Sequence, residues 1–353
     1  MLLHKMGKSL VLGFFDGVHK AHRAVIESAL NISDDVTLVT FKNSPAVYFG
    51  KKCEYILSRK NSLEKIKTLG VKDIVELEFS KIASIKAEDY LEYLVNTYHP
   101  ISISTGFNHT FGLEKLGNPE LLNKSEKKYG YKYICVPPVI ENGEIVSSTL
   151  IRKYLKEAEI EKANSLLESN FILEGEVIHG AKIGRTIGFP TANINYPMGI
   201  VKIPFGVYKV LVNIEDKHLT PPLSSKEREL NPSFKERNCS GFEPLYEVAK
   251  NTNSINEQIY IGADYKTDSL SLEERGGVRC SFKPAIMNWG MKPTVNNTVE
   301  PVIEVHILNY NGDLYGKNIK IEVLKQIRGE KKFANLDDLK SQINEDIKEC
   351  LKL

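Results

Sequence analysis

Apolar residues follow two different patterns along the chain. In about the first 150 residues, short apolar runs typical of buried strands alternate with stretches whose apolar residues recur every three or four positions, as on one face of a helix. Strands are predicted at residues 9–12, 36–41, 74–79, 101–104 and 133–136, and helices after His19 and at residues 62–69 and 87–97. Strands that alternate with helices predict an α/β domain with a doubly wound parallel sheet, which binds ligands at the carboxyl ends of its strands.

After a predicted helix at residues 149–167 the pattern changes. Short strand-like runs, separated by Gly, Pro and Asn, lie at residues 171–179, 206–214, 285–288, 302–308 and 319–324. This spacing predicts a small antiparallel β-barrel. The final segment, 336–350, has the apolar period of a C-terminal helix, with Asn335 as its N-cap. The sequence therefore predicts two domains, at residues 1–156 and 170–353.

Residues 218–282 fit neither pattern. Pro, Ser, Asn and charged residues dominate this segment, and no apolar period persists in it. A loop of this length is unusual inside a compact domain. We therefore interpret it as an irregular insertion in the C-terminal domain and expect it to carry no catalytic residue.

The two ends of this segment are related at the codon level. If residues 221–228 are encoded CCA CCC CTC TCC TCT AAA GAG AGG, the complementary strand, read one base out of register, encodes the sequence of residues 270–277. We hypothesise that a short DNA element with terminal inverted repeats inserted into the gene in frame. The alternative is a variable surface loop, since long insertions in surface loops are tolerated. The nucleotide sequence distinguishes the two, because mismatched ends would contradict the hypothesis.

Charge and cysteine content narrow the class of protein. The 353 residues include 47 basic and 45 acidic side chains, and a net charge of +2 gives no field that favours nucleic acid or an anionic membrane as a partner. The five cysteines are scattered and include no C-x-x-C pair, so neither a disulfide framework nor a zinc site is predicted. No stretch resembles a signal peptide or a membrane span, and we expect the protein to be cytoplasmic.

A motif at a predicted strand–helix junction suggests a phosphate site. Residues 13–22 read Gly-Phe-Phe-Asp-Gly-Val-His-Lys-Ala-His. Glycines let the backbone approach a phosphate, and a helix N-terminus presents free N–H groups. His19 and His22 share one face of the first helical turn and can donate hydrogen bonds to a triphosphate as charge develops on the leaving pyrophosphate. Taken alone, two such histidines are also consistent with surface or capping roles.

This motif resembles the G-x-F-D-G-x-H-x-G-H signature of bacterial FAD synthetases, which are nucleotidylyltransferases. Two later stretches match family motifs in the same order: residues 106–112 look like G-x-[DN]-F-x-F-G, and residues 147–152 match S-S-T-x-I-R. The resemblance implies catalytic roles for His19 and His22. It also implies a set of residues that bind ATP and its phosphates: Gly13, Phe15, Asn108, Ser148, Thr149 and Arg152.

Several departures from these motifs bear on adenylyl transfer. Ala21 stands where the family has Gly, and Lys42 and Ser44 replace the Asp and His of a T-F-D-P-H-P motif. His109 occupies an aromatic position of the later loop. Because adenylyl transfer mainly requires alignment of two substrates and stabilisation of charge, we expect these changes to slow the reaction rather than abolish it.

A second motif spans residues 180–193, Gly-Ala-Lys-Ile-Gly-Arg-Thr-Ile-Gly-Phe-Pro-Thr-Ala-Asn. A glycine-interrupted loop with two basic residues leads to a hydroxyl and a carboxamide two positions apart. These groups suit the phosphates of a nucleotide and Mg²⁺, which prefers oxygen ligands. A turn-rich hairpin without a ligand would have a similar composition.

This stretch resembles the G-x-x-x-G-R-T-x-G-F-P-T-A-N signature of riboflavin kinases. Further family patterns match at residues 206–208 (G-V-Y), 288–294 (N-x-G-x-x-P-T), 304–306 (E-x-H), 314–317 (L-Y-G-K) and 328–333 (R-x-E-x-x-F). The resemblance implies that Thr191 and Asn193 hold Mg²⁺–ATP and that the loop from Lys182 to Gly184 covers the phosphates. Glu304 would accept the proton of the riboflavin 5′-hydroxyl, unless it is an outward strand residue paired with a lysine.

The two resemblances together imply a bacterial bifunctional riboflavin kinase/FAD synthetase. Such an enzyme phosphorylates riboflavin to FMN and adenylylates FMN to FAD, with ATP and Mg²⁺ and without a nucleic-acid or membrane partner. Two alternatives stay open. One is a riboflavin kinase with a weakened or inactive adenylyltransferase half, and the other is a non-catalytic flavin- or nucleotide-binding protein disabled by the insertion.

Overall fold

The computed structural model describes residues 7–180, 183–186, 188–215, 282–293 and 299–352. The first part of the chain contains a sheet of five parallel strands in the order β3-β2-β1-β4-β5. The strands are β1 (Lys8–Leu12), β2 (Asp35–Phe41), β3 (Asp73–Leu77), β4 (Ser102–Gly106) and β5 (Lys132–Val136). The order reverses between β1 and β4, which creates the switch point where doubly wound sheets bind ligands.

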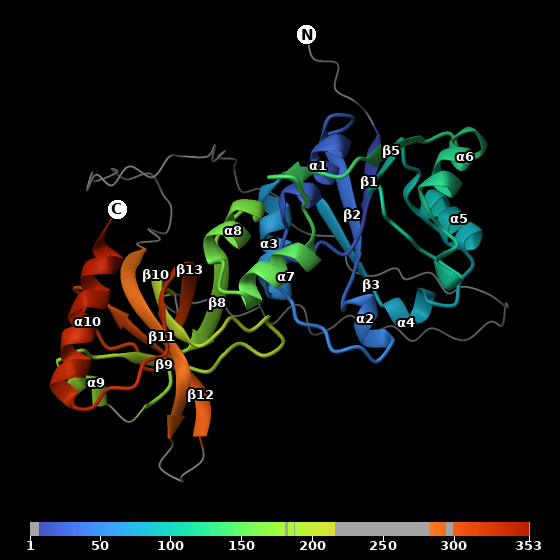
Figure 1. Cartoon of the computed structure of the whole chain (residues 1–353). Coiled ribbons are helices and arrows are strands. Elements are labelled where there is room, and N and C mark those ends of the chain that lie inside the picture. The colour runs from blue at the N-terminus through green and yellow to red at the C-terminus, as the bar shows by residue number, and fades with distance from the viewer. Residues whose placement is uncertain (1–6, 181–182, 187, 216–281, 294–298, 353) are drawn as a thin grey trace, which may run out of the picture. The chain divides into compact units, whose positions relative to one another are not determined.

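Helices cover both faces of this sheet (Figure 1). Leu10 and Leu12 of β1 pack with α5 and α6, whereas Val11 packs with α1 and α3, because successive strand residues point to opposite faces. The helices are α1 (Lys20–Leu30), α2 (Pro45–Tyr48), α3 (Arg59–Thr68), α4 (Phe79–Ile82), α5 (Ala87–Tyr98) and α6 (Pro119–Tyr129). The predicted doubly wound parallel sheet is thus confirmed.

Two predicted boundaries in this part are wrong. The strand predicted to reach residue 79 ends at Leu77, since Phe79 begins α4. The single helix predicted at residues 149–167 is two helices, α7 (Ser148–Lys156) and α8 (Ile160–Leu166). Ala158 lies between them with φ 60°, a left-handed conformation that interrupts a right-handed helix.

The second part contains a six-stranded antiparallel sheet in the order β8-β13-β10-β11-β12-β9. The strands are β8 (Phe171–Glu176), β9 (Ala192–Ile194), β10 (Gly206–Glu215), β11 (Lys283–Pro293), β12 (Val299–Ile307) and β13 (Asn318–Gly329). The two edges meet at a bridge in which the Ile178 N–H donates to the Asn193 carbonyl at 2.8 Å. This closure and the antiparallel pairing agree with the predicted small barrel.

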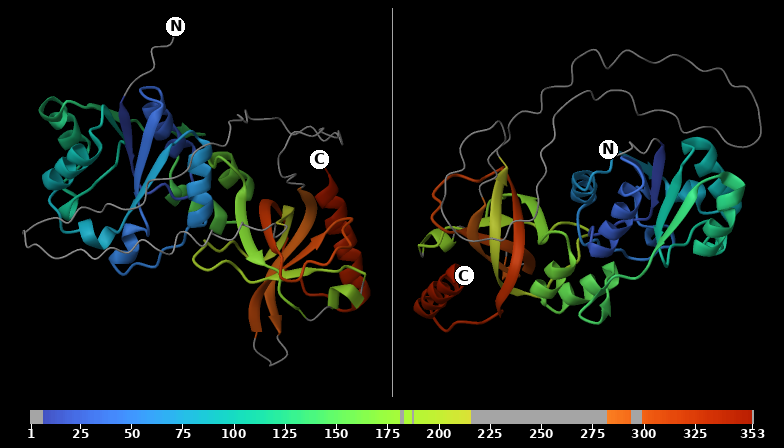
Figure 2. Two further views of the ribbon diagram at one scale, coloured as in Figure 1. Left: turned by 180° about the vertical axis from the view of Figure 1, so that it is seen from behind. Right: turned by 90° about the horizontal axis from the view of Figure 1, so that it is seen from above.

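The barrel interior is filled by large apolar side chains. Phe171, Tyr208 and Trp289 are almost fully buried, and the Trp289 indole N–H donates to the Ile203 carbonyl at 3.0 Å. On the outside, α10 (Leu336–Leu351) packs against strands of the sheet (Figures 1 and 2). This helix confirms the one predicted at residues 336–350.

The predicted insertion at residues 218–282 lies outside the described residues, apart from residue 282. The described strands on either side of it are β10, which ends at Glu215, and β11, which begins at Lys283. They are antiparallel neighbours, with Val212 opposite Lys283. The segment between them therefore connects two adjacent strands of the barrel.

Two candidate nucleotide sites

The first site is built on the turn between β1 and α1, at the carboxyl end of the central strand. Phe15, Gly17 and Val18 all have positive φ, which folds the backbone tightly before the helix begins. A Cβ atom at Gly13 would lie 2.7 Å from the Phe15 ring, so that position accepts only glycine without movement of the ring. Gly13 and Phe15, both predicted to bind ATP, therefore lie against each other in this turn.

His19 and His22 lie stacked at the start of α1, with ring centroids 3.6 Å apart. The backbone N–H of His22 donates to His19 Nδ1 at 3.4 Å, so His19 is the N-cap and carries its proton on Nε2. Burial, with a smaller contribution from the Arg152 charge, lowers the pKa of His19 to about 4. Burial also lowers the pKa of His22 well below its usual value. At neutral pH both rings are uncharged hydrogen-bonding groups.

A buried ion pair ties the third motif to the first. Asp16 is 5% exposed and accepts hydrogen bonds from the Ile56 N–H and from Nη2 of Arg152. Arg152 Nε also donates to the Glu54 carbonyl at 2.7 Å, and Ser148 Oγ donates to the Asp16 carbonyl at 3.0 Å. Burial raises the pKa of Asp16, against the opposing effect of the Arg152 charge. The start of α7 is thereby held beside the β1–α1 turn.

Two more of the predicted phosphate-binding residues, Asn108 and Thr149, are exposed to solvent. Asn108 follows the carboxyl end of β4 in a turn closed by the His109 N–H and the Gly106 carbonyl, 3.1 Å apart. Thr149 is in the first turn of α7. The strand order puts β4 beside β1, so Asn108 follows the same edge of the sheet as the histidine turn.

The residues that depart from the family motifs have structural partners of their own. Lys42 forms an ion pair with Glu78 at 3.0 Å. Ser44 is the N-cap of α2, its hydroxyl accepting from the Ala46 N–H at 3.3 Å. His109 stacks with Phe111, and burial lowers its pKa to about 4. Each of these three residues therefore makes a contact of its own in the fold.

The second site lies on the barrel, where three polar residues form a row across adjacent strands. Glu304 on β12 is directly opposite Asn193 on β9 and Asn288 on β11. The flanking residues Ile303 and Val305 point into the core, so Glu304 points to the other face of the sheet. Opposed strand residues have Cβ atoms about 5 Å apart. The register therefore brings a carboxylate between two carboxamides.

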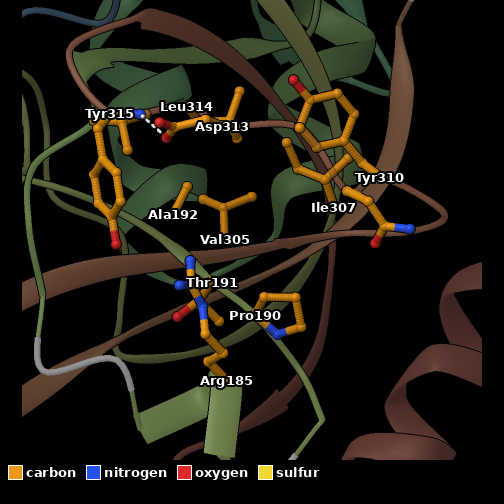
Figure 3. Close-up of a pocket in the computed structure, with 13 residues that line it drawn as sticks. Arg185, Pro190, Thr191, Ala192, Val305, Ile307, Tyr310, Asp313, Leu314 and Tyr315 are labelled. Carbon is orange, nitrogen blue, oxygen red and sulfur yellow. Dashed lines mark hydrogen bonds between the residues drawn. The ribbon is translucent and has the colours of Figure 1, made fainter.

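A cavity of about 370 Å³ lies at the core-facing side of β12, where Val305 and Ile307 line it together with Thr191. Figure 3 shows Arg185, Pro190 and Thr191 on one side of it, with Tyr310, Asp313 and Tyr315 from the loop after β12 on the other. The Tyr315 N–H donates to Asp313 Oδ1 at 3.1 Å, which shapes that loop. The cavity thus combines a guanidinium and a hydroxyl with aromatic and apolar walls, a lining that suits a nucleotide.

Glycines keep the backbone close to the two predicted metal-binding residues. A Cβ atom at Gly180 would lie 2.4 Å from the amide nitrogen of Asn193, and one at Gly184 would lie 2.3 Å from the Phe189 carbonyl oxygen. The Phe189 N–H donates to the Gly184 carbonyl at 2.8 Å, which closes the loop before Thr191. Lys182, predicted to cover phosphates, lies outside the described residues.

The donors at this site fit a hard divalent cation that arrives with a nucleotide. Thr191 and Asn193 offer neutral oxygens, and Glu304 offers a carboxylate beside them. Among the described residues, no group of three or more His, Cys, Asp and Glu side chains is placed to hold a metal ion. Magnesium commonly binds through few protein ligands and completes its shell with substrate phosphates and water. The few oxygen ligands at this site fit a magnesium ion bound in this way.

Two different protein families match the two parts of the chain. The riboflavin kinase family model matches residues 167–353, and the FAD synthetase family model matches residues 3–150. The chain belongs to the bifunctional riboflavin kinase/FAD synthetase family. Its two parts carry riboflavin kinase and FMN adenylyltransferase activities, with riboflavin, FMN and ATP as substrates, and these ATP-dependent families use a divalent metal.

Similarity to bacterial members of the family extends over nearly the whole chain. Three relatives are each named bifunctional riboflavin kinase/FMN adenylyltransferase. The protein of Haemophilus influenzae is 28% identical over 349 residues, covering 97% of this chain and 92% of the relative. The Bacillus subtilis protein is 27% identical, covering 100% and 94%, and the Escherichia coli K12 protein is 28% identical, covering 96% and 90%.

A solved structure shares this two-part fold. A protein of Streptococcus pneumoniae described as a macrolide-efflux protein superimposes with a TM-score of 0.72 at 25% identity, covering 97% of this chain and 93% of that one. That description belongs to the Streptococcus protein. In the part of the chain that the structure describes, no helix has the length and apolar character needed to cross a bilayer.

Several residues of the two candidate sites in this bifunctional enzyme were not predicted from the sequence. Asp16 lies within the first motif, but its pairing with Arg152 joins residues 136 positions apart and has no local signal. Arg185 lies within the second motif, yet only the structure shows that it lines the cavity. Tyr310 and Asn311 precede the L-Y-G-K match and reach the cavity because β12 ends just before them.

Proposed function

We propose that the barrel phosphorylates riboflavin at the row that contains Glu304. The supporting observation is the position of this carboxylate, opposite Asn193 and Asn288 and next to the strand end where Thr191 lines the cavity. The riboflavin 5′-hydroxyl oxygen attacks the γ-phosphorus of ATP, the bond to the β-phosphate oxygen breaks and ADP leaves. Glu304 accepts the hydroxyl proton, which a carboxylate can do because this transfer depends more on positioning than on base strength.

Thr191 and Asn193 are proposed to hold Mg²⁺ with ATP in this reaction. A magnesium ion supplies neutralisation of the charge on the β- and γ-phosphates when it is bound. The cavity beyond Thr191 would take the base and ribose of the nucleotide, with Arg185 close enough to meet a phosphate. Lys182 and Gly184 would cover the phosphates. The glycines at 180 and 184 support this role, because side chains there would displace Asn193 and the loop before Thr191.

The parallel-sheet part is proposed to adenylylate FMN at the β1–α1 turn. A phosphate oxygen of FMN attacks the α-phosphorus of ATP, the bond to the β-phosphate oxygen breaks and pyrophosphate leaves. His19 and His22 donate hydrogen bonds to the phosphates as uncharged rings, which their lowered pKa values require at neutral pH. The other proposed phosphate-binding groups are Gly13, Phe15, Asn108, Ser148, Thr149 and Arg152.

The substitution Glu304→Gln tests the kinase assignment. We expect the rate of FMN formation to fall by about 10²–10⁴, because the amide cannot accept the proton. FMN-to-FAD conversion by the same protein should be unchanged and serves as an internal control. Glu174→Gln, on β8 opposite Lys320, is the matched control substitution and should leave both rates unchanged. Phosphorylation at the wild-type rate in Glu304→Gln would remove Glu304 from this role.

Product analysis tests the alternative of a weakened adenylyltransferase half, which the substitutions Ala21, Lys42 and Ser44 raise. With riboflavin, ATP and Mg²⁺, the wild-type protein should form FMN and then FAD. Accumulation of FMN without any FAD would contradict the proposed adenylylation site.

We also propose that the protein works in the cytoplasm, in line with the unpaired thiols of Cys53, Cys135 and Cys350. Tagged protein in the envelope fraction of the cell would contradict this location.

A further inference from the structure

His306 lies two residues after Glu304 on β12 and bonds to the loop that carries Thr191. Its Nδ1 is 2.8 Å from the carbonyl oxygen of Pro190. The Phe189 ring meets the imidazole edge-on, with centroids 5.6 Å apart and planes at 85°. One side chain of β12 therefore contacts both residues that precede Thr191.

The direction of this hydrogen bond follows from its chemistry. A carbonyl oxygen only accepts, so His306 Nδ1 must carry a hydrogen and donate it. Pro190 has no backbone N–H, so it cannot donate a backbone hydrogen bond to β12. The His306 side chain instead bonds to the carbonyl of Pro190.

The bond stands where the strand pairing stops. The backbone pairing of β9 with β12 runs through Asn193–Glu304 and ends at Ala192–Val305. The next position on β12 is His306, and the next position toward the loop is Thr191. Beyond the last backbone pair, the side chain of His306 makes the contacts between β12 and residues 189–190.

We propose that His306 is a positioning residue for the kinase reaction, which fixes the Phe189–Thr191 segment so that the Thr191 hydroxyl faces the metal and phosphates of ATP. This inference rests on the proposed role of Thr191. Glu304 and His306 share one strand, so the same element sets the place of the proton acceptor and of the nucleotide loop. Loss of the bond weakens the binding of ATP and leaves riboflavin binding and proton transfer in place.

Two amide substitutions separate this role from other roles. In His306→Asn the amide nitrogen occupies nearly the place of Nδ1, whereas in His306→Gln it occupies nearly the place of Nε2. We expect His306→Gln to raise the KM for MgATP about tenfold, the effect of one lost hydrogen bond. His306→Asn should restore the KM to within about threefold of wild type. The KM for riboflavin, the thermal midpoint and the adenylylation rate should be unchanged in both variants.

Three results would overturn the proposal. Equal KM values for MgATP in the Asn and Gln variants would show that the Nδ1 bond is immaterial. A fall in kcat at unchanged KM for MgATP, with a shifted pH–rate profile, would make His306 a catalytic proton carrier instead. A lowered thermal midpoint with both KM values unchanged would reduce His306 to a structural residue.

Thr191→Val, measured alongside, separates failure of this inference from failure of the assigned site. A raised KM for MgATP in Thr191→Val with no change in His306→Gln would overturn the positioning role alone. Wild-type kinetics in Thr191→Val would overturn the nucleotide site itself, and the role of His306 with it.

Discussion

Three imidazoles of the parallel-sheet part have lowered pKa values because they are buried: His19, His22 and His109. An unfolded chain protonates its histidines near pH 6.5, whereas the folded protein resists protonation of His19 and His109 down to about pH 4. The unfolded state therefore binds more protons between these pH values. By linkage, the folded state loses stability as the pH falls through this window.

His109→Phe tests this coupling at a single position. The Nε2 atom of His109 is buried and has no hydrogen-bonding partner among the described residues, which costs about 1–3 kcal/mol. A phenyl ring removes that cost, so the variant should be more stable than wild type at pH 7 in urea unfolding. At pH 5 the difference in unfolding free energy between the variant and wild type should be larger by on the order of 1–2 kcal/mol. The variant lacks the buried imidazole whose lowered pKa destabilises the folded wild type at acidic pH. A variant less stable than wild type at both pH values would contradict this explanation.

The residues proposed for both sites could be drawn from the sequence because each motif is local. Gly13, His19 and His22 lie within one turn of chain, and the turn itself brings them together. The Asp16–Arg152 pair could not be predicted in this way, since burial between distant segments creates it. The hydrogen-bonding state of His19 also depends on tertiary burial, which no motif expresses.

At the scale of elements, a buried ion pair holds α10 on the barrel. Asp346 is 3% exposed and accepts hydrogen bonds from Nε and Nη2 of Arg328, on β13, at 2.8–3.1 Å. Gln342, one turn earlier on α10, also donates to Asp346 at 3.2 Å. The match of Arg328 to the closing family pattern thus has a structural reason, since it anchors the last helix.

Asp346→Asn should loosen this helix. The neutral amide cannot balance the partly buried guanidinium of Arg328, and we expect a loss of about 1–3 kcal/mol of unfolding free energy in the barrel part. Glu345→Gln, an exposed neighbour on the same helix, makes the same chemical change and should stay within about 0.5 kcal/mol of wild type. Thermal unfolding followed by tryptophan fluorescence reports the barrel, because Trp289 is buried in its core. Equal midpoints for the two variants would contradict the anchoring role.

Element type was predicted well where a pattern was strong and poorly where it was weak. The apolar pattern did not predict α6, because this helix has only one fully buried apolar residue, Leu122, and is defined by its ends instead. Asn118 caps its start and Gly130, with φ 76°, ends it. β9 was missed because three residues are too few to show a period. β13 runs five residues beyond its predicted end because its outer positions are polar and pair only in the sheet.

At the scale of the molecule, the division into two catalytic parts follows from the sequence because each part has its own period and its own motif. Alternating strands and helices end before α8, and every later strand that the structure describes joins the antiparallel sheet. The family matches at residues 3–150 and 167–353 fall on the same two parts. A barrel was predicted, but the residues that close it, Ile178 and Asn193, were not, since their pairing depends on how far the sheet curls.

The connection between β10 and β11 provides a test at this scale. Val212 and Lys283 are paired across the two strands, so a short loop can join them, and hairpin loops commonly need about two to five residues. We predict that replacing residues 216–281 with a five-residue Gly- and Asn-rich loop leaves kcat/KM for riboflavin phosphorylation within about threefold of wild type, because Thr191, Asn193 and Glu304 lie on other segments. Adenylylation should be unaffected, and steady-state assays of both reactions measure the outcome. A shortened protein that keeps its thermal midpoint but loses FMN formation would show that the removed residues take part in the kinase site, against the expectation that this segment carries no catalytic residue.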